Sequence, residues 1–150
     1  SAIIVESDAV LNTGVWYHLT ATYDGSGNAN GVNLYINNTV NNNIVNDNLT
    51  GIITNTEPVQ IGGQDTFFTA GQIGKTRLWN TKLTAGEVNT QYNGGTIQTN
   101  PVKSVNLILD TDINNATFTS EFNIPDLTGI TAGYTSVNME AGDILNDCPE

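Results

Sequence analysis

The chain has 150 residues, enough for one domain with a sizeable core, and carries a formal net charge of −11 with only four basic residues. Nucleic acids and anionic membrane surfaces are bound through Lys and Arg, so this charge balance excludes both as partners. No apolar run approaches the roughly 18 residues of a membrane-spanning helix, so no membrane insertion is expected. Most of the polarity comes from 22 Asn and 21 Thr residues, which favour turns and strands respectively. The composition therefore predicts an all-β fold with many loops.

The first part of the chain is predicted to form an antiparallel hairpin followed by an exposed edge. Residues 15–23 are rich in aromatic and β-favouring side chains, and residues 32–36 alternate between apolar and polar ones. Asp24-Gly25 opens a polar loop between these two strands, which favours a hairpin. The Asn-rich tract 37–48 has too few apolar residues to pack, so we expect an exposed loop or an edge strand there.

The remainder of the chain is predicted to add short strands and one helix. Thr84 and Glu87 have the spacing of a capping box, and residues 93–95 supply a stop, which together predict a surface helix of about two turns. A bulge is expected at Gly74, where the alternation of a strand over residues 71–79 slips. The other predicted strands are 51–53, 59–63, 105–109, 116–118 and 121–124, and turns are predicted at 128–129 and 132–133.

A change in the residue pattern near residues 96–103 predicts a domain boundary. Residues 1–100 are expected to form an antiparallel β-sandwich, and residues 101–150 an acidic, β-rich extension, either packed on the sandwich or separate from it. From residue 104 to the end there are eight acidic residues and no basic one. This acidic surface either keeps the protein soluble or collects divalent cations or a basic partner.

Five blocks of residues follow one another in a distinctive order between residues 15 and 95. They are 16–25, which contains Trp-x-His and Tyr-Asp-Gly, then 31–38, 59–63 with 71–73, 77–80, and 83–95. In this order they resemble the laminin-G-like, concanavalin-A-like jelly-roll family, of the type found in phage fibre, appendage and bacterial surface proteins. The resemblance implies an antiparallel β-sandwich that works outside the cytoplasm, on a cell surface or a viral particle.

The resemblance also predicts which part of the family domain is present. Several strands precede the Trp-x-His block in the family, whereas only fourteen residues precede Val15 here. We therefore expect the C-terminal half of the domain, either within a longer chain or completed by a partner. Family members often carry an acidic pair in the closing strand, where this chain has Gly74-Lys75. Residues 101–150 lie outside the resemblance.

Few residues here are suited to metal or nucleophilic chemistry. A single His and a single Cys exclude a zinc site built from several histidines or thiolates, and Cys148 cannot form an intrachain disulfide. His18 is interpreted as a structural residue and not as a general base. Trp16 and Trp79 both sit in strand patterns and are expected in the core.

Glycoside hydrolysis needs two carboxylates about 5–9.5 Å apart. Acids spaced to share one face of a strand occur at Asp110 with Asp112 and at Glu6 with Asp8. Neither pair comes with a convincing aromatic platform, and the sequence lacks the alternating acids of the glucanases. We therefore predict that the chain is not an enzyme.

Calcium is the expected metal, because it is bound by carboxylate and Asn oxygens, both abundant here. The resemblance implies a site at the loop end of the sandwich, for which the candidate ligands are Asp24, Asn28 and Asp65. An Asp-Gly pair is also a good turn, so a purely structural role for Asp24 stays open. The candidate sugar contacts are Phe67, Phe68 and Asn28, since adjacent residues of a strand cannot both point inward. Packing against the C-terminal extension would explain an exposed Phe equally well.

Three functions follow from these observations. The first is a lectin-like adhesion module within a larger fibre or surface protein, which binds a glycan or a surface receptor. The second is a structural virion or appendage subunit that packs against copies of itself. A glycan hydrolase is the weakest of the three.

Overall fold

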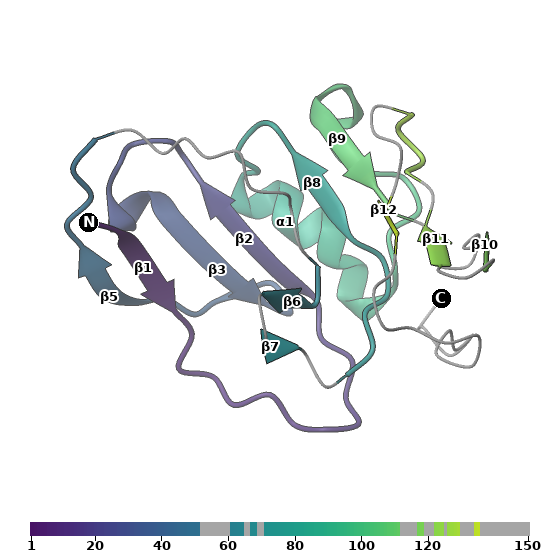
Figure 1. Cartoon of the computed structure of the whole chain (residues 1–150), viewed down its shortest axis with the longest axis horizontal. Coiled ribbons are helices and arrows are strands. Elements are labelled where there is room, and N and C mark those ends of the chain that lie inside the picture. The colour runs from purple at the N-terminus through teal and green to yellow at the C-terminus, as the bar shows by residue number, and fades with distance from the viewer. Residues whose placement is uncertain are drawn as a thin grey trace. The chain divides into compact units, whose positions relative to one another are not determined.

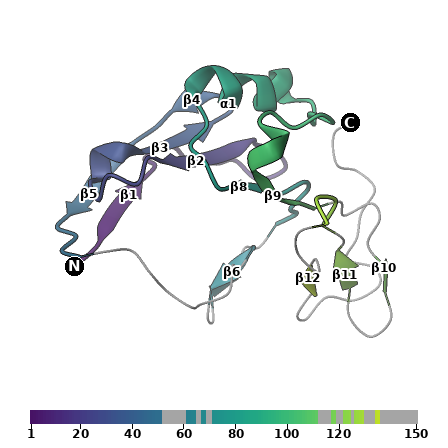
Figure 2. The same cartoon turned by 90° about the horizontal axis from the view of Figure 1, so that it is seen from above.

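The computed structural model describes residues 1–51, 61–64, 67–68, 71–111, 117–118, 122–124, 126–129 and 134–135. These residues belong to two compact units, each assembled from segments that are distant in the sequence. Residues 1–51 and 81–105 belong to the first unit, and the described residues between 61 and 80 and between 106 and 135 belong to the second. The boundary near residues 96–103 stays a prediction. Figures 1 and 2 show the elements of each unit.

The first unit is built on the predicted hairpin. Strand β2 (Leu19–Tyr23) pairs antiparallel with β3 (Val32–Ile36) along its whole length (Figure 1). A polar loop that ends in a 3-10 turn (Ala29–Gly31) joins them, and Gly25 adopts a positive φ of 79° just after β2, which glycine does without steric cost. The short strand β4 (Thr39–Val40) continues the sheet beyond β3. The hairpin prediction is confirmed.

The Asn-rich tract forms edge strands, as predicted. Besides β4, it contains β5 (Asn43–Asp47), which pairs antiparallel with β1 (Ile3–Glu6) with one irregularity in register. Most residues of β4 and β5 are exposed, including the apolar Val40, Ile44 and Val45, as is typical of edge strands.

The strand predicted over residues 15–23 begins only at Leu19. Its partner β3 ends opposite, at Ile36, and Asn37 closes the turn by bonding both the amide and the carbonyl of His18. Residues before His18 therefore have no β3 residue to pair with. Trp16 lies in this stretch and is 37% exposed, so its expected place in the core is wrong. Trp79 is half-buried on a later strand.

Helix α1 (Ala85–Tyr92) confirms the predicted capping box. The Thr84 hydroxyl accepts a hydrogen bond from the Glu87 amide (3.3 Å), and the Glu87 carboxylate accepts one from the Thr84 amide (2.7 Å). Asn93 ends the helix in the left-handed conformation and begins a 3-10 turn (Asn93–Gly95). Val88 of the helix and Leu83 before it are buried in the first unit. In both views α1 lies beside the β2–β3–β4 sheet (Figure 2).

The second unit consists of small antiparallel sheets. Strand β8 (Arg77–Trp79) pairs with β9 (Leu107–Asp110), which follows a 3-10 turn (Ser104–Asn106). Strand β6 (Gly63–Gln64) pairs with β7 (Phe67–Phe68). A further sheet has the order β10 (Thr117–Phe118), β11 (Phe122–Ile124) and β12 (Tyr134–Thr135). Leu107 and Leu109 supply the buried apolar side chains of β9.

The predicted strand over residues 71–79 is shorter than expected. Only Arg77–Trp79 is strand, and the register irregularity lies between Leu78 and Trp79, not at Gly74. The bulge prediction is therefore misplaced, because the ladder with β9 starts only after Gly74. The turn predicted at 128–129 is present.

All described strand pairs are antiparallel and one short α-helix accompanies them, so the all-β fold class is confirmed. Residues 52–60, Asp65, Asp112 and the predicted turn at 132–133 lie outside the described residues. Among the helices that the structure describes, none combines the length and the hydropathy needed to cross a bilayer.

Candidate functional site

The β2–β3 loop of the first unit contains two of the predicted site residues. Asp24 accepts a hydrogen bond from the Ser26 amide at 2.9 Å, and the Asn28 side-chain amide donates to the Ser26 carbonyl at 3.0 Å. Hydrogen bonds from the hydroxyl and the amide of Ser26, with a smaller contribution from Lys82, hold the pKa of Asp24 below its ordinary value of 3.8. The Asp24 side chain therefore stabilises the turn at the start of the β2–β3 loop, and its carboxylate is ionised at neutral pH.

Gly31 and Lys82 complete the surroundings of this carboxylate. A Cβ atom on Gly31 would collide with the Asp24 side chain, so only glycine allows the end of the loop to approach it so closely. The Lys82 ammonium lies 3.7 Å from Asp24 Oδ2 and 3.4 Å from the Gly31 carbonyl oxygen. One cationic side chain thus contacts both ends of the β2–β3 loop.

A second lysine connects this loop to helix α1. Lys103 donates to the Lys82 carbonyl at 2.9 Å and pairs with Glu87 Oε2 at 3.0 Å. The pKa of Glu87 is lowered from its ordinary value of 4.5 by the hydrogen bond from the Thr84 amide, and then by Lys103. The polar contacts therefore continue from Asp24 through both lysines to the capping box.

These contacts bear on the predicted calcium site. Two of its three candidate ligands, Asp24 and Asn28, lie in one loop, while Asp65 is outside the described residues. Calcium takes six to eight oxygen ligands, yet an ammonium group already contacts Asp24 and the Gly31 carbonyl. Among the residues that the structure describes, no cluster of three acidic, His or Cys side chains is present. The described donors do not by themselves fit calcium, and the site stays a prediction.

The predicted sugar contacts belong to two different units. Asn28 lies in the exposed loop of the first unit, whereas Phe67 and Phe68 form strand β7 of the second unit. Phe67 pairs with Gln64 and Phe68 with Gly63 in the β6–β7 ladder. Their role in sugar binding stays a prediction.

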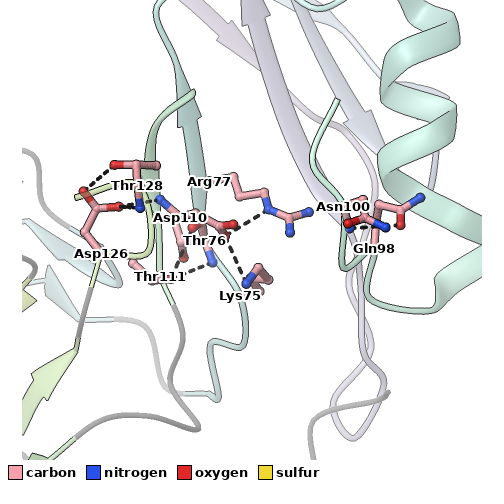
Figure 3. Close-up of polar contacts among 9 residues, drawn as sticks. All are labelled: Lys75, Thr76, Arg77, Gln98, Asn100, Asp110, Thr111, Asp126 and Thr128. Carbon is pink, nitrogen blue, oxygen red and sulfur yellow. Dashed lines mark hydrogen bonds and ion pairs between the residues drawn. The ribbon is translucent and has the colours of Figure 1, made fainter. Parts of the chain in front are cut away.

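The second unit contains a compact ionic cluster, shown in Figure 3. The Asp110 carboxylate, at the end of β9, forms ion pairs with Lys75 and Arg77. Lys75 Nζ and Arg77 Nε each lie 3.0 Å from the same oxygen, Oδ1. The Asp110 and Arg77 side chains are only 7% and 8% exposed. Arg77 faces Asp110 directly across the β8–β9 ladder, so the strand register fixes this pair.

Two further polar side chains hold the neighbouring backbone. The Asp126 carboxylate accepts hydrogen bonds from the Asp110 amide (3.0 Å) and from the amide and hydroxyl of Thr128 (3.0 and 2.7 Å). The Thr111 hydroxyl accepts the Thr76 amide at 2.9 Å (Figure 3). The cluster around Asp110 is thus held by backbone as well as by charge, as expected of a structural ion pair.

The structure gives little support to the acid pairs considered for glycoside hydrolysis. Asp110 is 7% exposed and has two cations on one carboxylate oxygen, so little of its carboxylate is accessible to a substrate. Its proposed companion Asp112 lies outside the described residues. Asp8 is exposed and accepts a hydrogen bond from the Asn43 side chain, and no such contact joins it to Glu6. His18 stacks at a tilt on Tyr92, with ring centres 5.9 Å apart, as expected of a structural residue.

One surface feature was missed at the sequence level. Large apolar side chains are exposed throughout the segment Val10–Leu19, namely Val10, Leu11, Val15, Trp16 and Leu19. The β-favouring character of residues 15–23 predicts a strand there, and only the end of β3 reveals that this strand begins at Leu19.

The comparisons with known proteins agree with the geometry. Residues 1–89 match a laminin G family model described as the concanavalin A-like lectin/glucanases superfamily. This match spans more than half of the chain, including the β2–β3 loop and the Val10–Leu19 segment, and supports the predicted β-sandwich class. The searches of curated proteins and of solved structures found no match.

Proposed function

The chain belongs to the concanavalin A-like lectin/glucanase superfamily, and on that premise we propose that it is a non-catalytic, lectin-like recognition module. It binds a glycan or a surface receptor as part of a virion appendage, such as a fibre, or of a cell-surface protein, outside the cytoplasm. The observation that carries this proposal is the exposed apolar surface of the Val10–Leu19 segment, with Trp16 as its aromatic side chain.

Five large apolar side chains are exposed within ten residues of the chain, which is more than the scattered single ones of an ordinary surface, and larger exposed apolar surfaces mark sites of interaction. Aromatic side chains serve such sites well, because they offer a large rigid face at a low entropic cost. The segment ends at the first residue of β2, whose pairing with β3 supplies a rigid support. Asp110, the buried carboxylate of the described residues, is held by two cations, which supports binding over catalysis.

A matched pair of variants tests the role of the segment. Val10 is 84% exposed and lies within it, whereas Val105 is 92% exposed and lies outside it. We expect Trp16→Ala and Val10→Ser to weaken adhesion to a glycan array or to intact host-type cells, Trp16→Ala by at least about tenfold. Val105→Ser should bind like the unmodified chain. Equal binding by all three variants would refute the assignment of this segment.

A structural subunit of a virion or appendage is the second candidate. It is favoured by exposed apolar side chains on both strands of the β1–β5 pair, at Ile4, Ile44 and Val45. Exposed apolar edge strands readily pair with other chains. Sedimentation of the native chain over a range of concentrations distinguishes the two candidates, because a stable monomer excludes obligate self-assembly.

A further inference from the structure

All four basic side chains of the sequence lie in described residues, and each is engaged inside the protein. Lys75 and Arg77 share Asp110 Oδ1 at 3.0 Å each. Lys103 pairs with Glu87 at 3.0 Å and donates to a backbone carbonyl at 2.9 Å. Lys82 has the loosest contacts, 3.7 Å to Asp24 and 3.4 Å to the Gly31 carbonyl.

Proteins bind anionic glycans mainly through Arg and Lys side chains, and in this chain these side chains already take part in ion pairs. Sulfate and carboxylate groups are recognised by the planar fork of Arg, which can donate two parallel hydrogen bonds, or by the point charge of Lys. The single Arg of this chain is 8% exposed and has its Nε directed at Asp110. A sulfated or sialylated ligand would therefore compete with an existing carboxylate partner for each of these cations.

The remaining charge opposes anions as well. The net charge of −11 already counts all four cations, so every acidic residue beyond those four adds to repulsion. At physiological ionic strength this repulsion extends over about 8 Å. Trp16, by contrast, offers an uncharged face, and the neighbouring exposed side chains Val10, Leu11 and Val15 are also uncharged.

We propose that the ligand of this module is an uncharged glycan, and that sulfated and sialylated glycans are rejected because the chain offers no unengaged basic side chain to them. This inference rests on the proposed recognition function and specifies the chemical class of its ligand. A neutral ligand releases no counterions on binding, so the affinity is nearly independent of salt.

An array with three panels, neutral, sialylated and sulfated glycans, tests the inference at about 50 and 200 mM NaCl. We expect binding to the neutral panel alone, with dissociation constants that agree within about twofold at the two salt concentrations. Binding to the sulfated or sialylated panel that weakens with salt would overturn the inference and leave the recognition function standing. An array without any binding, probed with verified folded protein, would overturn this inference, and adhesion to intact host-type cells would then decide whether recognition of a surface receptor still stands.

A charge insertion makes the test sharper. Asn12 is exposed within the Val10–Leu19 segment, so Asn12→Lys adds an unengaged ammonium group next to the proposed contact surface. We expect this variant to gain salt-dependent binding to the sulfated panel, whereas Val105→Lys, with the same net charge, should not. If Asn12→Lys binds neutral glycans but gains no sulfated ones, the missing cation is not what rejects anions, and the inference fails.

Discussion

Asp24 and Asp110 each accept a lysine ammonium, yet their surroundings give the two carboxylates different roles. The Asp24 side chain is 40% exposed and its lysine lies at 3.7 Å, whereas Asp110 is 7% exposed and holds two cations at 3.0 Å. Exposed pairs contribute little because water screens them, while removing one partner of a buried pair leaves a charge without compensation. The comparison teaches that burial, and not the presence of an ion pair, decides where this fold depends on charge.

The largest effect is expected at Asp110. Asp110→Asn leaves Lys75 and Arg77 next to each other without their shared anion, so we expect the free energy of unfolding to fall by about 3 kcal/mol. Urea denaturation of this variant measures the loss. The matched control is Asp8→Asn, which makes the same change of charge at an exposed acid and should cost less than about 0.5 kcal/mol. Similar losses in both variants would remove the distinction between buried and exposed acids.

A smaller, pH-dependent effect is expected at Glu87. Gln can still accept the hydrogen bonds of the capping box, so Glu87→Gln removes mainly the charge that faces Lys103. Because the pKa of Glu87 is lowered in the folded state, its contribution is fully present above its ordinary value of 4.5 and is lost as the pH falls through the lowered value.

The variant should therefore be less stable than the unmodified chain at neutral pH and equally stable in strong acid. Urea midpoints recorded along a pH series measure this convergence. A difference between the two chains that is the same at every pH would show that the charge of Glu87 contributes nothing.

The smallest effect is expected at Asp24. In Asp24→Asn a neutral side chain can still accept the hydrogen bonds of Ser26, so the main loss is the exposed contact with Lys82. We expect a loss of stability smaller than that of Glu87→Gln, and one that vanishes in about 1 M NaCl, where the screening length is about 3 Å. A loss of stability that persists at high salt would show that Asp24, like Asp110, contributes an interaction that water and salt do not screen. The distinction between the exposed and the buried ion pair would then be wrong.

The contacts of the predicted calcium site differ in how far the sequence specifies them. Asp24 and Asn28 are brought together because they lie four positions apart in one loop, and a sequence can specify such a loop through its Gly and Asn residues. The companion of Asp24, Lys82, lies 58 positions further along the chain and was not predicted. No local pattern marks such a partner, since it depends on where the segment before α1 meets the hairpin.

The cluster around Asp110 shows the same limit. In the sequence these residues belong to unrelated patterns. Gly74-Lys75 is a departure from the family pattern, and Asp110 is one half of a pair of acids. The Arg77–Asp110 bond spans 33 residues, and only the pairing of β8 with β9 places the two side chains on facing positions. A carboxylate considered for catalysis is thereby part of the structural framework.

The sequence by itself determined the β2–β3 hairpin, the capped helix α1, the edge character of the Asn-rich tract and the excess of negative charge. These features arise from side-chain alternation, turn residues and caps within a few neighbouring positions, or from composition alone. Only the tertiary structure decided that Trp16 is exposed and that the four cations are engaged. Exposure and charge pairing depend on contacts between segments distant in the chain, and local patterns do not encode where those segments meet.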